Sequence, residues 1–223
     1  SGVVAMLSTL IETRVERNRG HGQRVARITD FMARSFNLTP ALSKDLELAS
    51  LLHEAGYLLL PQSFLDKDAA SLSDDEKQLC ELVPERGAQF LAAYPGLEGA
   101  AGIIRSMNEN ADGTGRPDGL KKRHIPLASK VLAGADHLDS LRDQAGNNGI
   151  EGILKGLELA AGTRLDPSIV AWLGKYAVLH MASDTFRVRG IGIHQLEPGM
   201  TLGTALFTHT GTKLFSVNTL LTK

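Results

Sequence analysis

The sequence predicts a mainly α-helical domain over residues 1–183, followed by a small β-rich module over residues 184–223. Two observations lead to this fold class. Up to about residue 180, apolar residues recur at intervals of three and four, which is the spacing of an amphipathic helix. After Asp184, short runs rich in Thr, Val, Ile and Phe are separated by Gly and Pro, which is typical of strands and turns.

The helical domain is expected to hold about seven or eight helices, separated by capping and helix-breaking residues. Thr39 followed by Pro40 is typical of a helix N-terminus, and "SDDE", which starts at Ser73, has the spacing of a capping box. Gly56 is expected to end the helix that begins near Thr39. Pro84 is expected to kink or divide the next helix, which follows Ser73. The expected helices cover about 3–18, 25–36, 39–56, 73 onwards, 97–107, 127–141, 151–161 and 166–180.

Composition argues against several function classes. The net charge is −1 and no dense Lys and Arg patch is present, so nucleic acid is not an expected partner. The lone cysteine, Cys80, excludes an internal disulfide and fits a reducing, cytoplasmic location. No apolar run approaches the ~20 residues that span a bilayer, so membrane insertion is not expected. Because the chain starts with "SGVV" and not with Met, we expect a further domain upstream.

The stretch "NENADGTGRPDG", residues 108–119, is a long helix-breaking loop between two expected helices. Glycine allows backbone conformations that other residues avoid, and proline fixes φ. Loops of this length inside a compact domain are usually functional or disordered, although a plain surface turn is the alternative. The candidate ligand or partner residues of this loop are Glu109, Asp112, Gly113, Gly115, Arg116, Pro117 and Lys121.

Four further residues, His21, His53, Glu54 and Asp136, are candidate metal ligands. Imidazole and carboxylate groups are the usual protein ligands of zinc and related divalent metals. Taken one at a time, each has a structural alternative, since a lone His is more often a hydrogen-bonded core residue and an Asp can bond a nearby backbone group. No residue is predicted as catalytic.

The order of these residues, H…HE…D with the glycine loop before the Asp, resembles the HD superfamily of metal-dependent phosphohydrolases. The HD-GYP branch is the closer match. The stretches that carry the resemblance are "GHGQRVARI", "LASLLHEAGYLLLPQSFLDKDAASLSDDEKQ", "NENADGTGRP" and "HIPLASKVLAGADHLDSL". They cover about residues 10–180 in the order and at the spacing of the family. The tail "LEPGMTLGTALFTHTGTKLF" resembles a β element found beside such domains in bacterial response regulators.

The resemblance implies an HD-domain helical bundle with a metal site at the four candidate ligands and cyclic di-GMP beside the glycine loop. The metal of such a site is Fe, Mn, Zn or Mg. Glu54 stands where the family has Asp and is longer by about 1.5 Å, whereas ligand distances tolerate only about ±0.2 Å. The sequence therefore leaves open whether one divalent metal or none is bound.

Several departures from the family pattern argue against a second or third metal. Val83 replaces a ligating His and has no ligand atom. Met107, with Asn108, replaces the paired histidines of the family, and a thioether suits Mn, Mg or Fe(II) poorly. Arg17 brings positive charge to the position of an acidic ligand. The remaining replacements are Tyr57 for Lys, Arg116 for the Tyr of GYP, and Ala145 and Asn147 after the final Asp helix.

Three functions follow from this pattern. The first is a degenerate HD-GYP signalling domain that regulates by binding a protein or ligand. The alternatives are a single-metal phosphohydrolase acting on a nucleotide or phosphoester, and a residual cyclic di-GMP phosphodiesterase. Expected partners are another signalling protein or the chain's own upstream domain, and a homodimer is left open. Cyclic di-GMP that binds uncut would use Arg116, Lys121, Lys122 and Arg123 for its phosphates.

Overall fold

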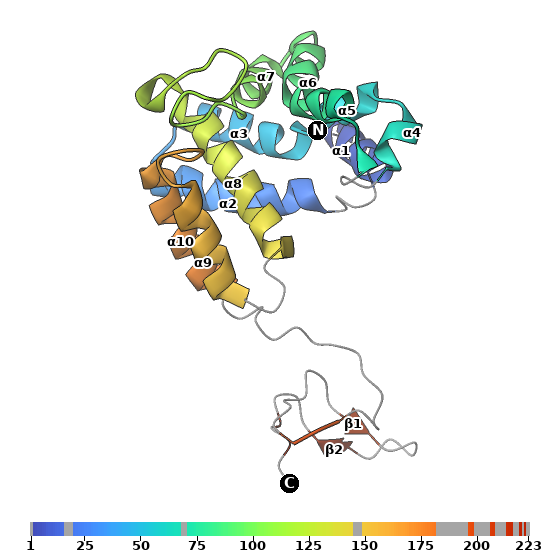
Figure 1. Ribbon diagram of the computed structural model, residues 1–223, viewed down its shortest axis with the longest axis vertical. Helices are drawn as coiled ribbons and strands as arrows, with labels where there is room; N and C mark the ends of the chain where they lie inside the picture. Colours follow the sequence, from blue (N-terminus) through green and yellow to red (C-terminus); the bar gives the residue numbers. More distant parts are fainter. Residues whose placement is uncertain are drawn as a thin grey trace. The chain divides into compact units, whose positions relative to one another are not determined.

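The computed structural model describes residues 2–15, 20–67, 71–144 and 149–181, and positions 196–198, 206–207, 213–215, 219 and 221 of the C-terminal part. The chain divides into two compact units, Ser1–Leu179 and His180–Lys223. The described part of the first unit is a bundle of helices joined by loops (Figure 1). The expected mainly α-helical fold is confirmed. Among the described residues, no helix is long and apolar enough to cross a membrane.

The described residues contain ten α-helices, more than the seven or eight expected. The α-helices are α1 (Gly2–Arg14), α2 (His21–Ser35), α3 (Pro40–Leu52), α4 (Gln62–Leu65), α5 (Asp74–Glu81), α6 (Val83–Ala92), α7 (Glu98–Arg105), α8 (Leu127–Gln144), α9 (Gly149–Ala160) and α10 (Pro167–His180), and the 3₁₀ helices are η2 (Ala55–Leu59) and η4 (Lys122–His124). Pro84 lies in the first turn of α6, so it divides the expected fourth helix into α5 and α6. The short α4 is the second helix that was not expected from the sequence.

Local capping chemistry explains where several helices begin. The Thr39 side chain accepts a hydrogen bond from the Leu42 N–H at the start of α3. Ser73 and Glu76 form the expected capping box at the start of α5. Three expected boundaries are wrong. The first helix ends at Arg14 and not at about 18, and α2 begins at His21 and not at about 25. Helix α3 ends at Leu52 and not at Gly56. A Cβ at Gly56 would lie 2.0 Å from the Val83 carbonyl oxygen, so this glycine allows the close approach of η2 and α6.

The core of the first unit lies where α2 packs against both α3 and α8, and α7 in turn packs against α3 and α8. In Figure 1, α8 passes across α2. Helices α2, α3 and α8 all contribute large side chains that are almost fully buried, among them Ile28, Met32, Leu46, Leu132 and Leu138. This packing brings the start of α2, the end of α3 and the middle of α8 together.

In the described positions of the second unit there are two short strands, β1 (Leu206–Phe207) and β2 (Lys213–Phe215). They pair antiparallel with Leu206 opposite Phe215. Most of the expected β-rich module lies outside the described residues. The boundary at residues 183 and 184 therefore stays a prediction. Positions 17, 145 and 147, at which the sequence departs from the family pattern, also lie outside the described residues.

Candidate metal centre

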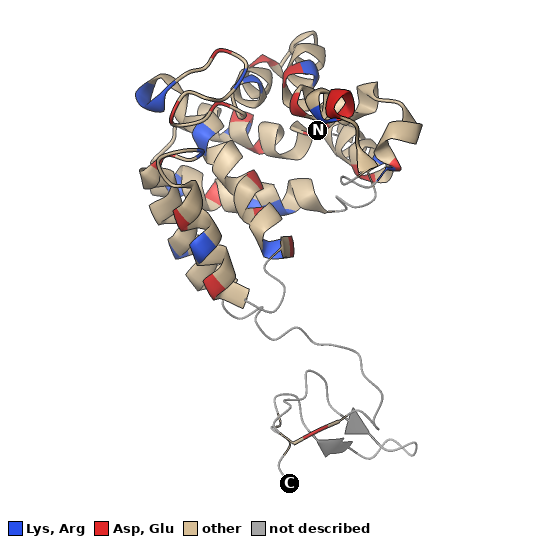
Figure 2. Cartoon of the chain, viewed as in Figure 1, with Lys and Arg blue, Asp and Glu red and all other residues tan. Residues whose placement is uncertain are grey.

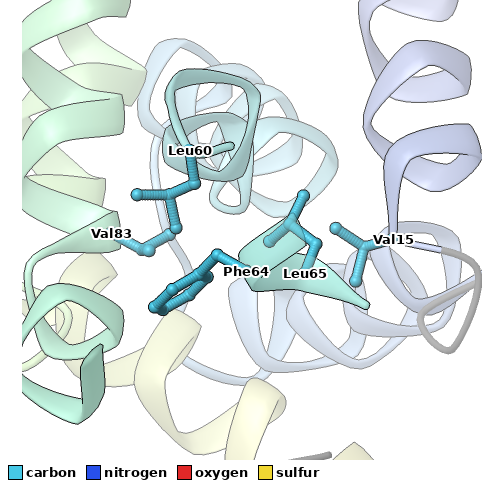
Figure 3. Packing of buried hydrophobic residues seen from close by; sticks show 5 residues of the cluster. All are labelled: Val15, Leu60, Phe64, Leu65 and Val83. Atoms are coloured by element: carbon cyan, nitrogen blue, oxygen red, sulfur yellow. The ribbon is translucent and has the colours of Figure 1, made fainter. Parts of the chain in front are cut away.

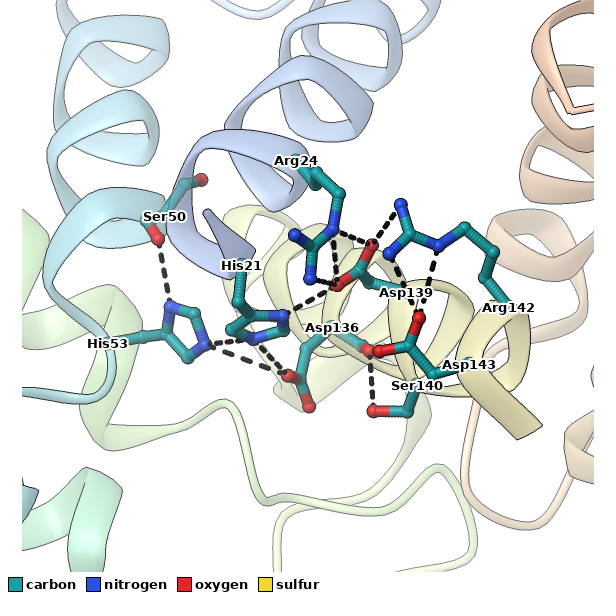
Figure 4. Close-up of polar contacts among 9 residues, drawn as sticks. All are labelled: His21, Arg24, Ser50, His53, Asp136, Asp139, Ser140, Arg142 and Asp143. Carbon is teal, nitrogen blue, oxygen red and sulfur yellow. Dashed lines mark hydrogen bonds and ion pairs between the residues drawn. The ribbon is translucent and has the colours of Figure 1, made fainter. Parts of the chain in front are cut away.

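Three helices bring His21, His53 and Asp136 to one place (Figure 4). His21 is the first residue of α2, and Gly20 before it has φ 71°, a left-handed conformation that suits glycine. His53 is the C-cap residue of α3. Asp136 lies in the middle of α8. The two histidine side chains are buried, with 10% and 5% of their surface exposed, whereas the Asp136 side chain is 24% exposed.

The distances between the three side chains suit ligands of a single ion. His21 Nε2 lies 3.1 Å from His53 Nε2 and 3.2 Å from Asp136 Oδ1. His53 Nε2 lies 3.6 Å from the same carboxylate oxygen. Two ligand atoms that each sit ~2.0–2.2 Å from one metal, at octahedral or tetrahedral angles, are about 2.8–3.6 Å apart. The donor set therefore fits one divalent cation.

The other nitrogen of each ring is occupied by a hydrogen bond, which turns both Nε2 atoms toward Asp136. His53 Nδ1 lies 2.9 Å from the Ser50 carbonyl oxygen, and His21 Nδ1 lies 2.7 Å from Asp139 Oδ2. Because a carbonyl or carboxylate oxygen can only accept, Nδ1 must be the donor in both rings. A neutral ring then has its lone pair on Nε2, as a metal ligand requires.

Asp139 and Arg24 extend this site, and neither was singled out from the sequence. Asp139 is almost fully buried, and Arg24 donates from Nε to Oδ1 and from Nη2 to Oδ2, both at 2.8 Å. A second guanidinium, of Arg142, lies 3.6 Å from Asp139 Oδ1. The available signal was spacing, because Arg24 follows His21 by three positions and Asp139 follows Asp136 by three, and residues so spaced share a helix face.

The electrostatics of the cluster favour positive charge. Burial disfavours the imidazolium form of His21, but hydrogen bonds to Asp136 and Asp139 outweigh it and raise the pKa of His21 to about 10. Burial opposes charge on His53 as well, yet Asp136 and Glu54 raise its pKa. Burial alone would raise the pKa of Asp136, but the two histidines hold it well below its usual range. The site is thus suited to a cation, whether proton or metal.

Glu54, the fourth predicted ligand, stands apart from this group. Among the described residues, the ligand atoms that lie within 4.8 Å of one another belong to His21, His53 and Asp136. Glu54 is the N-cap residue of η2, and its charge raises the pKa of both histidines. Its role as a ligand stays a prediction.

An apolar cluster occupies the surroundings of Val83, where the resemblance places a ligating His (Figure 3). Val83 is 3% exposed and packs with Val15, Leu60, Phe64 and Leu65. Tyr57, which replaces the family Lys, packs against the same cluster. Met107 is also buried, at 5% exposure. None of the five clustered side chains carries a metal-binding atom, so this cluster supplies no ligand for a second ion.

The glycine loop is held by its own backbone and by a buried carboxylate. Glu109 is 4% exposed, and its two carboxylate oxygens accept hydrogen bonds of 2.7 Å from the Asp118 and Leu120 N–H groups. A Cβ at Gly115 would lie 2.1 Å from the Asn110 nitrogen, and Gly113 has φ 84°, so both positions require glycine. Glu109 thus organises the loop from inside.

The other candidate residues of the loop lie nearer the surface. Asp112 accepts hydrogen bonds from the backbone N–H and the hydroxyl of Thr114. Arg116 is exposed and its Nη1 lies 3.4 Å from Glu81 Oε2, and a cis peptide bond joins it to Pro117. Lys121 is exposed, and its aliphatic stem lies beside Gly113.

Comparisons with known proteins agree with this fold. The HD domain family matches residues 5–169. A cyclic di-GMP phosphodiesterase of Thermotoga maritima is 26% identical over 173 residues, which are 75% of this chain and 47% of that protein. The crystal structure of a cyclic GMP-AMP-specific phosphodiesterase of Vibrio cholerae aligns with a TM-score of 0.64 at 20% identity, over 82% of this chain and 49% of that one. An HDG"Y"P protein of Bdellovibrio bacteriovorus aligns with a TM-score of 0.57 at 22% identity, over 71% and 51% of the two chains.

The chain belongs to the HD domain family, because the match covers most of its length and the histidines and aspartate of the pattern meet in one site. Its relatives and structural neighbours fit the HD-GYP branch that the sequence resembles. At 20–22% identity the two solved structures show the fold alone. The chain spans about half the length of the relatives described above.

Proposed function

We propose that this chain is a degenerate HD-GYP signalling domain, which regulates by binding a protein or a ligand and hydrolyses cyclic di-GMP poorly. One observation carries the proposal. The three-ligand cluster of His21, His53 and Asp136 is adequate for one ion, while Val83 and Tyr57 lie in an apolar cluster where the family pattern has a ligating His and a Lys. The proposed binding partner is another signalling protein or a nucleotide ligand.

The donor set supports one divalent metal at the cluster. Two imidazoles and one carboxylate suit Fe(II), Mn or Zn better than Mg, which prefers oxygen ligands. His21, His53 and Asp136 would hold the ion. When bound, such an ion would polarise a phosphoryl oxygen and lower the pKa of a water molecule.

Cleavage of a phosphodiester needs a second positive centre for the leaving oxygen. The nearby guanidinium of Arg24 is already paired with Asp139, and Arg142 is shared between Asp139 and Asp143. Loss of electrostatic stabilisation of this kind costs several kcal/mol, and ~1.4 kcal/mol is tenfold in rate. We therefore expect turnover of cyclic di-GMP to be lower by several orders of magnitude than an intact metal site allows.

The surface of the glycine loop supports binding without cleavage. Lys121, Lys122 and Arg123 are exposed next to one another at the end of the loop (Figure 2). Such a cluster can contact the phosphates of cyclic di-GMP or an acidic protein segment. An exposed ion pair such as Arg116 with Glu81 contributes little, about 0–1 kcal/mol, so Arg116 can exchange it for another anion.

The test is an assay of linear pGpG and GMP release with Fe(II), Mn(II) or Zn(II) supplied, alongside the metal content of the purified chain. We expect at most one metal per chain and a rate indistinguishable from that of His53→Ala. Turnover that is robust in the wild type and disappears in His53→Ala contradicts the proposal. Calorimetric titration with cyclic di-GMP then separates binding of the dinucleotide from regulation by a protein partner alone.

A single-metal phosphohydrolase is the second candidate, and the partial exposure of Asp136 favours it. With 24% of its side chain exposed, Asp136 is the most exposed of the three ligands, so a phosphoester would approach the cluster from its side. A panel of nucleotides and simple phosphoesters, assayed with and without metal, tests this candidate. Metal-dependent release of phosphate that His21→Ala and Asp136→Asn both abolish would favour it over the degenerate signalling domain.

A further inference from the structure

We infer that Asp139 is a positioning residue of the metal centre, and that Arg24 holds Asp139 so that His21 presents Nε2 to the ion. The inference rests on the proposed single-metal site, to which it adds a supporting pair of residues. Asp139 itself lies on the Nδ1 side of His21, away from the three ligand atoms. It therefore acts through His21.

Both oxygens of Asp139 are occupied in a way that selects one orientation. Oδ2 accepts from His21 Nδ1 at 2.7 Å and from Arg24 Nη2 at 2.8 Å, while Oδ1 accepts from Arg24 Nε at 2.8 Å. The carboxylate is 1% exposed, and a buried charge is costly unless it is well paired. The two-point contact with the planar guanidinium fixes the plane of the carboxylate and thereby the direction in which it meets the imidazole.

The two histidines differ in what fixes them. His53 donates to the Ser50 carbonyl oxygen, a backbone group of the last turn of its own helix, which side-chain substitutions leave in place. His21 stands at the very start of α2 and depends on a side chain from α8 instead. Of the two rings, the orientation of His21 is therefore the one that substitution can disturb.

The same two helices supply both the ligands and their support. His21 and Arg24 share a face of α2, and Asp136 and Asp139 share a face of α8 (Figure 4). The ligands His21 and Asp136 thus lie one helical turn before Arg24 and Asp139 on the same two helices. A bound ion and the buried ion pair of Arg24 and Asp139 would both stabilise the contact between α2 and α8.

The experiment measures the affinity of the full chain for Zn(II) by competition with a chelating dye. Loss of a carboxylate that supports a metal-binding His typically lowers metal affinity about 10- to 100-fold, and we expect this for Asp139→Ala. Asp139→Asn should lose less, because its amide oxygen can still accept from His21. Arg24→Gln should lower affinity several-fold, in the same direction.

Two matched controls separate positioning from charge. Asp143→Asn removes a carboxylate one turn further along α8, where it is 61% exposed and pairs with Arg142. Arg34→Gln removes an arginine of α2 whose exposed partner is Asp30. We expect both controls to keep the wild-type affinity. An equal loss in Asp143→Asn would show that net charge, and not the contact with His21, sets affinity, and would overturn the inference.

A spectroscopic measurement reports the orientation of the ring directly. In the Zn(II)-loaded protein with ¹⁵N-labelled histidine, His21 should show a metal-bound Nε2 and a protonated Nδ1 with a slowly exchanging hydrogen. In Asp139→Ala that hydrogen should exchange rapidly. If the signals and the affinity of Asp139→Ala match those of the wild type, the inference is wrong. The proposal that His21, His53 and Asp136 bind one metal ion then still stands.

The remaining outcomes are also decisive. If the wild type binds no Zn(II), Mn(II) or Fe(II), the single-metal proposal is wrong and this inference falls with it. If Asp139→Ala does not fold, Arg24→Gln and Asp139→Asn decide, because both keep a polar group at the buried position. Unchanged affinity in these two variants would overturn the inference.

Discussion

At the scale of single residues, the surroundings of a side chain decide its role more than its type does. Val83 lies among apolar neighbours, whereas Asp139, which the sequence does not distinguish from Asp143, is buried against His21 and Arg24. Glu109 belongs to the loop that is expected to meet a ligand, yet its carboxylate accepts hydrogen bonds from two backbone N–H groups of that loop. These roles follow from contacts between residues far apart in sequence or across a folded loop.

The glycine loop allows a prediction at this scale. Gly115→Ala would place a Cβ 2.1 Å from the Asn110 nitrogen and 2.4 Å from the Asn108 carbonyl oxygen, both backbone atoms that cannot easily move. We expect a loss of about 1–3 kcal/mol in the free energy of unfolding, measured by urea denaturation. Gly102→Ala on α7 is the control, because nothing lies within 4 Å of its Cβ. It should stabilise the chain by about 0.5–1 kcal/mol, and equal effects of the two substitutions would contradict the prediction.

At the scale of elements, helices α2, α3 and α8 form the frame of the site, and two of the three ligands stand at helix ends. His21 follows the left-handed Gly20 at the start of α2, and His53 is the C-cap residue of α3. Outside this frame, the residue before α10, Asp166, also connects α10 to α8. Asp166 accepts from the Ser168 N–H at 3.0 Å and from Lys130 Nζ at 2.9 Å.

The contact between α10 and α8 predicts a pH dependence of stability. Burial acts to raise the pKa of Asp166, but hydrogen bonds from Lys130 and Ser168 outweigh it and lower the pKa. The stabilisation is therefore present above the unfolded pKa, about 3.9, and is lost as pH falls through the lower folded pKa. Asp166→Asn keeps a capping side chain but removes the charge.

We expect Asp166→Asn to be less stable than the wild type by about 1 kcal/mol at pH 7, and the difference to shrink below about pH 4. Urea denaturation at a series of pH values measures it. Asp30→Asn, which removes the exposed partner of Arg34, is the control and should show little difference at any pH. A gap between wild type and Asp166→Asn that is constant from pH 7 to pH 3 would argue against the ionic origin of the effect.

At the scale of the whole molecule, a metal ion would join three helices that are far apart in sequence. His21, His53 and Asp136 come from α2, α3 and α8, so an ion bound to all three would oppose their separation. A ligand that binds only the folded state stabilises it by mass action, by about 2.7 kcal/mol at a concentration of 100 times Kd.

We therefore expect Zn(II) or Mn(II) to raise the Tm of the wild type by about 5–10 °C at saturating concentration, as judged by calorimetry. His53→Ala lacks one of the three ligands and should show little increase. The same increase in the wild type and in His53→Ala would place the ion elsewhere on the chain. If the Tm of the wild type does not increase, the proposal that His21, His53 and Asp136 bind one metal ion loses its basis.

The sequence by itself determined the helical class, most helix boundaries and the three residues that meet in the site. Helical periodicity and capping depend on neighbours within about four positions, as Thr39 and the Ser73–Glu76 capping box illustrate, and such signals can be read along the chain. The likeness to the HD-GYP pattern added His21, His53 and Asp136 through their order. It also proposed Glu54, which lies outside the group of converging ligand atoms.

Only the tertiary structure decided what surrounds those three residues. The pairing of Asp139 with His21 and Arg24 spans more than a hundred positions and exists because α8 packs across α2. The apolar surroundings of Val83 and the inward direction of Glu109 depend likewise on how separate segments close on one another. Hydrogen bonds and burial of this kind are set by packing in three dimensions. Spacing along one helix shows which residues share a face, but not which residue of another helix they meet.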